Sequence, residues 1–420
     1  MSVLLLHKSN ESRRRHLERA AAYAREKRER LLVLSNNPTW EHELADVVVS
    51  VNTSDIPATV GAVRDLAASE SEPIRAVAAF REHSVPAAAA VAAELGLPFV
   101  SEQAAQTVRD KYAMREALDA ENIPQPGYGL ARTIEEAMEQ AARIGFPMVL
   151  KPLIDNDSMY VRRVDDRDEL VEHFAGIQRG AWGGSASDPL YAWAVEKYED
   201  AILLEEYLPG TEISVESMLC DGKTNVVAVH DKPLPMEGPY FADVCFTTPS
   251  RFPEDVLRRV HELTAAAHRA IGIDTGATHT AFRIQEDGTP KIVETAARLG
   301  GGPVYQSILL STGVDMVSAV LDVASGRAPD LSAQPVPTPT GFYLFFAERA
   351  GKVSALTGVR DAERSPHVHE LALFCEVGSA VDVPPRAWQP HGHVVFTADS
   401  GDELRRRFYG LASSIQIELE

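Results

Sequence analysis

The chain is poor in several features that would each indicate a particular class of protein. Its three cysteines, Cys220, Cys245 and Cys375, have neither metal-ligand spacing nor the even count of a disulfide framework. No apolar run approaches membrane-spanning length, and the opening residues MSVLLLHKSN hold too short an apolar run for a signal peptide. These absences predict reduced thiols, a cytoplasmic location and no membrane partner.

Basic residues are also in the minority, and familiar cofactor motifs are missing. Lys and Arg number 41 against 61 Asp and Glu, a net charge of −20, which argues against general nucleic-acid binding. The sequence has no GxGxxG, so a Rossmann dinucleotide site is not indicated, and it has no Ser-His-Asp or metal-histidine motif. A length of 420 residues exceeds one compact core and predicts two or three domains.

Hydrophobic periodicity divides the chain into three predicted domains. Residues 1–102 alternate short apolar strands with helical sequence, the βαβ rhythm of a small parallel sheet. Residues 103–328 begin with one predicted helix at 103–121, and a mobile loop is predicted at 180–188 (GAWGGSASD). A proline-rich stretch then leads into β-rich sequence within 329–420. The predicted fold class is therefore α/β, with an N-terminal parallel domain and a C-terminal β-rich lobe.

The segment 278–302, THTAFRIQEDGTPKIVETAARLGGG, predicts a β-hairpin followed by a glycine turn. Asp287-Gly288 is a strong signal for a two-residue hairpin loop, which would pair Glu286 with Thr289. Counting outward from that loop sets the register of the two strands. An ordinary surface hairpin with a glycine loop is the competing interpretation.

In this register, Ala281 lies opposite Glu294, and His279 shares their face of the hairpin, because cross-strand partners point the same way. Arg298 and the turn Gly300–Gly302 follow at once, at the start of a predicted helix. Mg²⁺ prefers carboxylates and phosphate oxygens, and free N–H groups at such a turn favour anions. The segment therefore predicts a place for a hard cation beside a phosphate or carboxylate.

Five segments follow one another in a specific order along the chain. They read LGLPFVSEQAAQTVRDKYAMREALDAENIPQPGY, GFPMVLKP, ILLEEYLPGTEISVE, HDKPLPMEGPYFADVCFTTPS and THTAF…IVETAARLGGG. Their order and spacing resemble the ATP-grasp superfamily of carboxylate–amine ligases, and within it the L-amino-acid ligase branch, over nearly the whole chain. The resemblance implies an ATP-grasp fold, with its ATP-grasp domain at 103–328 and a lid subdomain at about 146–206.

The same resemblance implies roles for individual residues. It assigns nucleotide contacts to Lys111, Lys151 and Ser158, to an adenine-binding hinge of Glu205, Glu206, Tyr207 and Leu208, and to Glu212 as the ribose contact. It assigns a metal to Glu294, substrate contacts to Asp231, Lys232, Gly300 and Gly301, and catalysis to Arg298, His279 and Gly301. The implied cofactors are ATP and Mg²⁺, with Mn²⁺ as an alternative ion. The implied partners are a small-molecule carboxylate and amine, and a homodimer is left open.

The sequence departs from the family's pattern at three points. Residues 155–160 (DNDSMY) hold a serine but none of the glycines usual in the phosphate lid, Ala281 replaces an acidic metal ligand, and Ala296 replaces an asparagine. Three functions are therefore carried forward. They are an amino-acid or peptide ligase that works through an acyl phosphate, a purine-pathway-type ligase, and a nucleotide-binding protein with degraded catalysis.

Overall fold

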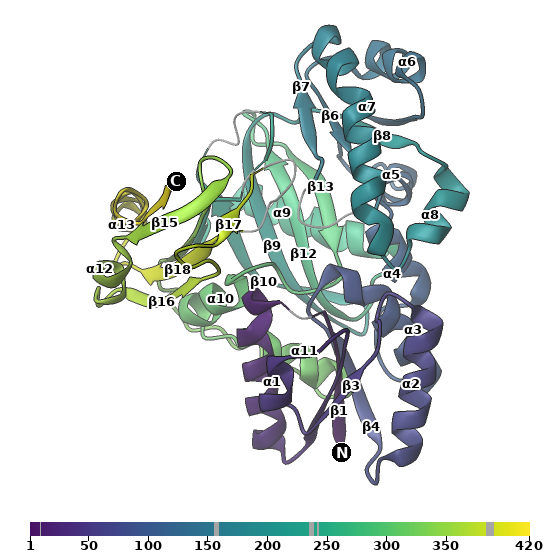
Figure 1. Cartoon of the computed structure of the whole chain (residues 1–420), viewed down its shortest axis with the longest axis vertical. Coiled ribbons are helices and arrows are strands. Elements are labelled where there is room, and N and C mark those ends of the chain that lie inside the picture. The colour runs from purple at the N-terminus through teal and green to yellow at the C-terminus, as the bar shows by residue number, and fades with distance from the viewer. Residues whose placement is uncertain (9, 155–158, 235–238, 242, 384–389) are drawn as a thin grey trace.

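The computed structural model describes the whole chain except residues 9, 155–158, 235–238, 242 and 384–389. The described residues form sheets of four, four, eight and three strands. In Figure 1 the N-terminal domain lies at the bottom, the lid subdomain at the upper right and the C-terminal strands at the left, around a central sheet. The site described below lies where these parts meet.

The N-terminal domain is the predicted parallel sheet with helices. Its strands are β1 (Ser2–His7), β2 (Arg30–Ser35), β3 (Val47–Ser50) and β4 (Ile74–Ala79), in the order β3-β2-β1-β4 and all parallel. Its main helices are α1 (Arg14–Lys27), α2 (Ile56–Ser69) and α3 (Val85–Leu95). The apolar runs read in the sequence are buried in these strands on both faces, which is typical of a parallel sheet between helices.

The helix predicted at 103–121 is instead two helices, α4 (Glu102–Arg109) and α5 (Lys111–Ala120). Asp110 separates them, because its extended backbone ends α4 while its side chain accepts hydrogen bonds from the first N–H groups of α5. The break makes Lys111 the first residue of α5, and its N–H donates to the Leu153 carbonyl near the lid.

The lid subdomain is an antiparallel sheet covered by helices. Its elements are β5 (Tyr128–Ala131), α6 (Ile134–Ile144), β6 (Met148–Lys151), β7 (Arg162–Val164), α7 (Arg167–Gly184), α8 (Tyr191–Tyr198) and β8 (Ile202–Glu206), with strand order β5-β8-β6-β7. The prediction of a mobile loop at 180–188 is wrong, because α7 continues to Gly184. A Cβ at Gly180 would lie 2.1 Å from the Tyr160 ring, so this glycine permits close packing.

One eight-stranded sheet crosses the predicted boundary between residues 328 and 329. Its order is β13-β12-β9-β10-β11-β14-β18-β16. The strands are β9 (Thr211–Cys220), β10 (Lys223–Lys232), β11 (Cys245–Thr248), β12 (Gly276–Ile284), β13 (Pro290–Ala296), β14 (Thr340–Phe345), β16 (Val368–Leu373) and β18 (Gly392–Thr397). Cys245 pairs with Tyr343 where the two predicted domains join. The C-terminal strands thus extend the sheet that begins within residues 103–328.

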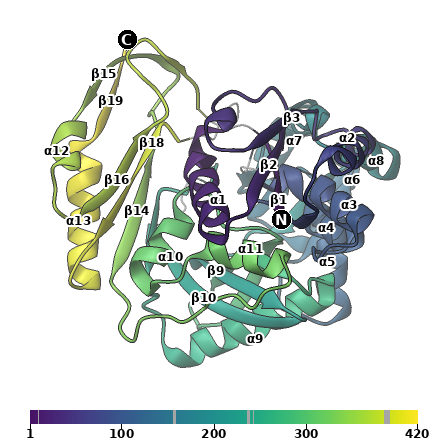
Figure 2. The same ribbon diagram turned by 90° about the horizontal axis from the view of Figure 1, so that it is seen from below.

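Helices and a small sheet cover the C-terminal strands and the lower face of the central sheet. α12 (Val359–Glu363) and α13 (Gly401–Ser414) lie on the outer side of β14, β16 and β18, and α9 (Glu254–Ile271) lies beneath the central strands (Figure 2). The three-stranded sheet contains β15 (Gly351–Thr357), β17 (Ala380–Val381) and β19 (Gln416–Leu419).

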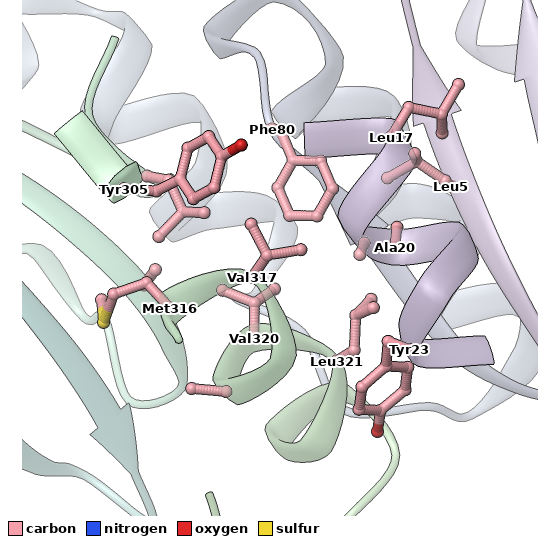
Figure 3. Close-up of a cluster of buried hydrophobic side chains, with 14 of the residues drawn as sticks. Leu5, Leu17, Ala20, Tyr23, Phe80, Tyr305, Met316, Val317, Val320 and Leu321 are labelled. Carbon is pink, nitrogen blue, oxygen red and sulfur yellow. The ribbon is translucent and has the colours of Figure 1, made fainter. Parts of the chain in front are cut away.

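The N-terminal domain is fixed against the two helices that follow the glycine turn, α10 (Val304–Thr312) and α11 (Met316–Ala324). Figure 3 shows Tyr23 of α1 beside Leu321 of α11, and Leu17 and Val317 belong to the same buried cluster. The His16 ring lies 4.4 Å from the Tyr305 ring. Residues on these elements belong to one buried apolar cluster, so the start of α1 and the glycine turn hold a fixed relation.

Within the described residues, no single helix has both the length and the hydropathy to cross a membrane. The pair α10 and α11 passes that test together, with a bend of 103° between its members.

The predicted hairpin forms, but its loop is longer than the predicted two-residue loop. Gln285 and Thr289 close a longer loop, so Ile284 pairs with Pro290 where the two-residue loop would pair it with Lys291. A bulge at Val293 adds one residue to β13 and restores the predicted register beyond it. Ala281 therefore lies opposite Glu294 and His279 opposite Ala296, as predicted.

Candidate active site

A cavity of about 620 Å³ lies where the N-terminal domain, the lid and the central sheet meet. Most predicted site residues line it: Lys111, Lys151, Glu205, Glu206, Tyr207, Leu208, Glu212, Lys232, His279, Glu294, Arg298 and Gly301. Gly300 is buried directly behind this lining. Two predictions fall elsewhere. Ser158 lies outside the described residues, and Asp231 lines a second cavity.

Lys151 ends β6 and forms a buried ion-pair group with Glu205 and Arg115. Its Nζ lies 2.6 Å from Glu205 Oε2, and Arg115 Nε donates to Glu205 Oε1 at 2.6 Å. Burial would raise the pKa of Glu205, but the charges of Arg115 and Lys151 outweigh it and lower the pKa from 4.5 to about 2. The Glu205 carboxylate therefore anchors Lys151, while the predicted adenine contact at Glu205 stays a prediction.

Arg115 was not predicted as a site residue. Its guanidinium also donates to the carbonyl oxygens of Val293 and, at 3.5 Å, Ile292 on β13. Arg115 thus joins the helix that begins at Lys111 to both the lid strand β8 and the strand that carries Glu294. The available signal was its position four residues after Lys111, which places both residues on one face of a helix.

The backbone N–H groups of the next two hinge residues, Glu206 and Tyr207, form hydrogen bonds within the protein. The N–H of Glu206 donates to the Gly127 carbonyl at 2.7 Å, and the N–H of Tyr207 donates to the Pro147 carbonyl at 3.2 Å. Glu206 is partly exposed and its carboxylate lies 3.2 Å from Lys291 Nζ. These two N–H groups are therefore engaged within the sheet, and the hinge edge continues at Leu208.

Glu212 and Lys232 face each other across neighbouring strands of the cavity floor. Lys232 Nζ lies 2.5 Å from Glu212 Oε1 and 2.6 Å from Asp243 Oδ1, and Arg283 Nε lies 3.1 Å from Glu212 Oε2. Burial would raise the pKa of Glu212, but Lys232 and Arg283 hold it below its ordinary value. The predicted ribose contact and the predicted substrate lysine thus form one charge-balanced network.

Glu294 lies on β13 opposite Ala281, and both residues line the cavity. Burial would raise the pKa of Glu294, but the nearby cations, chiefly Lys111 and Lys151 and also Arg298, outweigh it and lower the pKa. The described residues contain no cluster of three or more His, Cys, Asp or Glu able to hold a metal alone. An ionised carboxylate among cations fits Mg²⁺ that is also held by phosphate oxygens and water, since Mg²⁺ keeps several such ligands.

His279, Glu216 and the glycine turn form a compact group beside Glu294. His279 Nδ1 lies 2.5 Å from Glu216 Oε1, and the Gly300 N–H donates to Glu216 Oε2 at 3.2 Å. A Cβ at Gly300 would lie 3.0 Å from both the carboxylate and the ring and 2.8 Å from Val304. Gly300 is therefore required by this close approach, and Glu216 fixes the orientation of His279.

The N-terminal domain supplies two residues that hold the glycine turn and Arg298. Arg13, just before α1, donates to the Gly300 carbonyl at 3.1 Å, and Arg298 Nε lies 2.7 Å from Glu82 Oε2. Arg298 also donates to the Leu299 carbonyl at 2.8 Å. Sequence reasoning missed Arg13 and Glu82, because nothing in the sequence near residues 13 or 82 indicates contact with a turn more than 200 residues away.

Asp231 lies on β10 and does not line the cavity that contains most of the predicted site residues. Successive residues of a strand point to opposite faces, so Lys232 faces the main cavity and Asp231 faces away. Asp231 accepts hydrogen bonds from the Ser250 hydroxyl at 2.6 Å and the Arg251 N–H at 2.8 Å, while burial raises its pKa. These contacts indicate a role in fixing the 250–251 turn.

The ATP-grasp domain family matches residues 144–306, and the family described as L-amino acid ligase C-terminal domain 2 matches residues 343–420. The chain therefore contains an ATP-grasp domain in residues 144–306. The crystal structure of an L-amino acid ligase from Bacillus licheniformis superposes with a TM-score of 0.82 at 21% identity, covering 100% of this chain and 98% of that one. The predicted ATP-grasp fold is therefore confirmed.

Two curated relatives of this ATP-grasp chain carry functional names. Alanine–anticapsin ligase of Bacillus subtilis is 29% identical over 56% of this chain and 51% of the relative. The L-arginine-specific L-amino acid ligase of Bacillus subtilis is 20% identical over 65% of this chain and 63% of the relative. The chain thus spans about half to two thirds of the length of these two relatives.

Proposed function

We propose that the protein is an ATP-dependent carboxylate–amine ligase that joins amino acids or peptides and releases ADP and phosphate. The observation that carries the proposal is the content of one cavity. Lys111, Lys151, Glu294, Arg298 and Gly301 all line it, and the nearby cations keep the Glu294 carboxylate ionised. Two cations, a carboxylate and a guanidinium in one enclosed space suit the transfer of a phosphoryl group.

In the proposed reaction, Lys111 and Lys151 bind the phosphates of ATP as point charges, while the adenine ring lies against the hinge edge at Leu208. The carboxylate substrate attacks the γ-phosphorus, and the bond to ADP breaks as an acyl phosphate forms. Arg298 and the N–H group of Gly301 stabilise the transferring phosphoryl charge. Mg²⁺ or Mn²⁺ beside Glu294 would supply further charge neutralisation when bound.

The amine then attacks the acyl carbonyl carbon, and phosphate leaves with the electron pair of the broken C–O bond. Amino-acid substrates are supported by the match of residues 343–420 to the L-amino acid ligase C-terminal domain and by the names of the relatives. Loss of catalysis is disfavoured, because the phosphate-end cations, Glu294 and Arg298 all reach one cavity. A cytoplasmic location is part of the proposal, supported by the free thiols of the three cysteines.

The test is a screen of amino-acid pairs with ATP and Mg²⁺, with ADP release measured and products identified by mass spectrometry. We expect ADP release that requires both a carboxylate and an amine, together with a product lighter by one water than its two substrates combined. Glu294→Gln should abolish most of this activity, whereas the exposed Glu286→Gln, on the loop of the same hairpin, should retain it. ADP release only with purine-pathway substrates, or with none, would exclude the proposed function.

A further inference from the structure

His393 lies on the C-terminal side of the cavity and has no role in the site described above. It belongs to β18, is 4% exposed and lines the same cavity as Glu294 and Arg298. Its Nε2 lies 2.8 Å from Glu370 Oε1 on the neighbouring strand β16. The Phe374 ring packs edge-on against the imidazole at 5.5 Å and limits its rotation. His393 is therefore held in one orientation toward the cavity.

Glu370 is in turn held by groups from two other parts of the molecule. Gln306 of α10 donates to Glu370 Oε2, and Arg15 Nε of α1 lies 3.2 Å from the same oxygen. Burial would raise the pKa of Glu370, but the hydrogen bonds from His393 and Gln306 outweigh it and lower the pKa. Glu370 therefore stays an ionised acceptor, and the His393 proton is placed on Nε2.

The other ring nitrogen, Nδ1, is buried and has no hydrogen-bond partner in the part of the chain that the structure describes. A buried polar atom without a partner is costly, so its presence in a cavity wall indicates a ligand that completes the site. Several other buried histidines also have an unpartnered nitrogen, but only His279 and His393 are among the described residues that line this cavity. His279 already has Glu216 on its Nδ1.

His393 also lies close to the place where the acyl group would react. It pairs directly with Leu344 on β14, and cross-strand partners point the same way. A Cβ built at Gly302, the last glycine of the turn, would lie 3.8 Å from the Leu344 side chain. Gln306 follows that turn within α10 and reaches Glu370. One residue, Leu344, thus separates His393 from the turn that binds the phosphoryl group.

We propose that His393 is the general base that accepts a proton from the amine substrate, with Glu370 as its positioning residue. This inference rests on the proposed ligase function. An amino acid arrives as an ammonium ion, which has no lone pair to attack with. Nδ1 of His393 takes one proton from it, and the freed lone pair forms the C–N bond to the acyl carbon. The C–O bond to phosphate breaks, and the second proton leaves with hydrogen phosphate. The imidazolium then returns its proton to water.

The test compares two acceptors that differ in their need for a base. Hydroxylamine is largely neutral at pH 7 and attacks acyl phosphates directly, whereas an amino acid must first lose a proton. We expect His393→Gln to lose on the order of 10²–10⁴-fold in the rate of amide formation, the usual effect of removing a general base. Hydroxamate formation from the same carboxylate and ATP should stay within threefold of wild type, which also demonstrates a folded variant.

Two further variants complete the design. Glu370→Gln should reduce the amide rate without changing the hydroxamate rate or the KM for ATP, because it acts through the orientation of His393. His369→Gln is the matched control, since His369 lies next to Glu370 on β16, is exposed and contacts Thr397 away from the cavity. This control should behave as wild type with both acceptors.

The outcomes separate the inference from the function on which it rests. Equal losses of amide and hydroxamate in His393→Gln, or no loss of either, would overturn the role of His393 as a base. Wild-type protein that forms neither product with any carboxylate tested would instead overturn the ligase function itself. Amide loss with hydroxamate retained supports both.

Discussion

The ion-pair group around Glu205 yields a prediction with a calculable magnitude. Glu205 is 2% exposed and is the carboxylate shared by Arg115 and Lys151, each at 2.6 Å. Glu205→Gln keeps the shape of the side chain and removes its charge. The variant therefore leaves two buried cations with an uncharged partner, which should destabilise the lid and displace Lys151 from the position where ATP phosphates would bind.

The magnitude follows from the pKa of Glu205. A tenfold change in acid strength is worth about 1.4 kcal/mol, so a fall from 4.5 to about 2 corresponds to about 3 kcal/mol of folded-state stabilisation. This agrees with the roughly 3–5 kcal/mol lost when one partner of a buried ion pair is removed. Because the folded pKa is the lower one, the contribution is complete above pH 4.5 and is lost as the pH falls toward 2.

Hydrogen exchange followed by mass spectrometry measures this locally. At pH 7, peptides from β6 and β8 of Glu205→Gln should exchange on the order of 10²-fold faster than wild type, since about 1.4 kcal/mol is a factor of ten. Glu206→Gln is the matched control, because that neighbour is 37% exposed and its pairing with Lys291 should contribute less than about 1 kcal/mol. The difference between wild type and Glu205→Gln should also narrow below pH 4.5. Equal effects of the two substitutions at pH 7 would refute the reasoning.

Three further substitutions test the part of the cavity where phosphoryl transfer is proposed. Arg298→Lys should preserve ATP affinity but lower turnover about tenfold or more, since a lysine lacks the forked donor; steady-state kinetics that show only a raised KM for ATP would make Arg298 a binding residue. Ala281→Glu should lower the Mg²⁺ concentration needed for half-maximal rate, because the new carboxylate faces Glu294; an unchanged Mg²⁺ titration would exclude a metal position at 281. Gly300→Ala should lower turnover and reduce the thermal midpoint, because its Cβ would lie 3.0 Å from His279; wild-type values for both would contradict the need for glycine.

The sequence predicted those features that depend on local pattern. The βαβ alternation in residues 1–102 led to the observed parallel sheet, since apolar runs between helices are what such a sheet buries. The hairpin placed Ala281 opposite Glu294, although the predicted two-residue loop is wrong and the bulge at Val293 supplies the missing step. The glycines near 180 led to the wrong prediction of a mobile loop at 180–188, because they permit close packing against Tyr160.

The roles of charged residues were harder to predict, because they depend on partners distant in sequence. The hinge motif that suggested Glu205 as an adenine contact gave no sign that its carboxylate binds Arg115, 90 residues earlier. Arg13 and Glu82 reach the site through the packing of α1 and the N-terminal sheet against α10 and α11. Local periodicity fixes which face of an element is apolar, and it carries no information about which buried charges will meet.

The eight-stranded sheet limits how C-terminal segments could be exchanged between related proteins. Sequence families divide the chain at about residues 306 and 343, which suggests that C-terminal portions are interchangeable modules. A graft joined there would have to reproduce the pairing of Cys245 with Tyr343 and the stack of the Phe246 and Phe342 rings, whose centres lie 4.5 Å apart. A one-residue shift would turn every cavity-facing side chain of the new portion to the opposite face. Recombined proteins of this fold will therefore succeed or fail on strand register at β11 and β14 before any question of substrate preference arises.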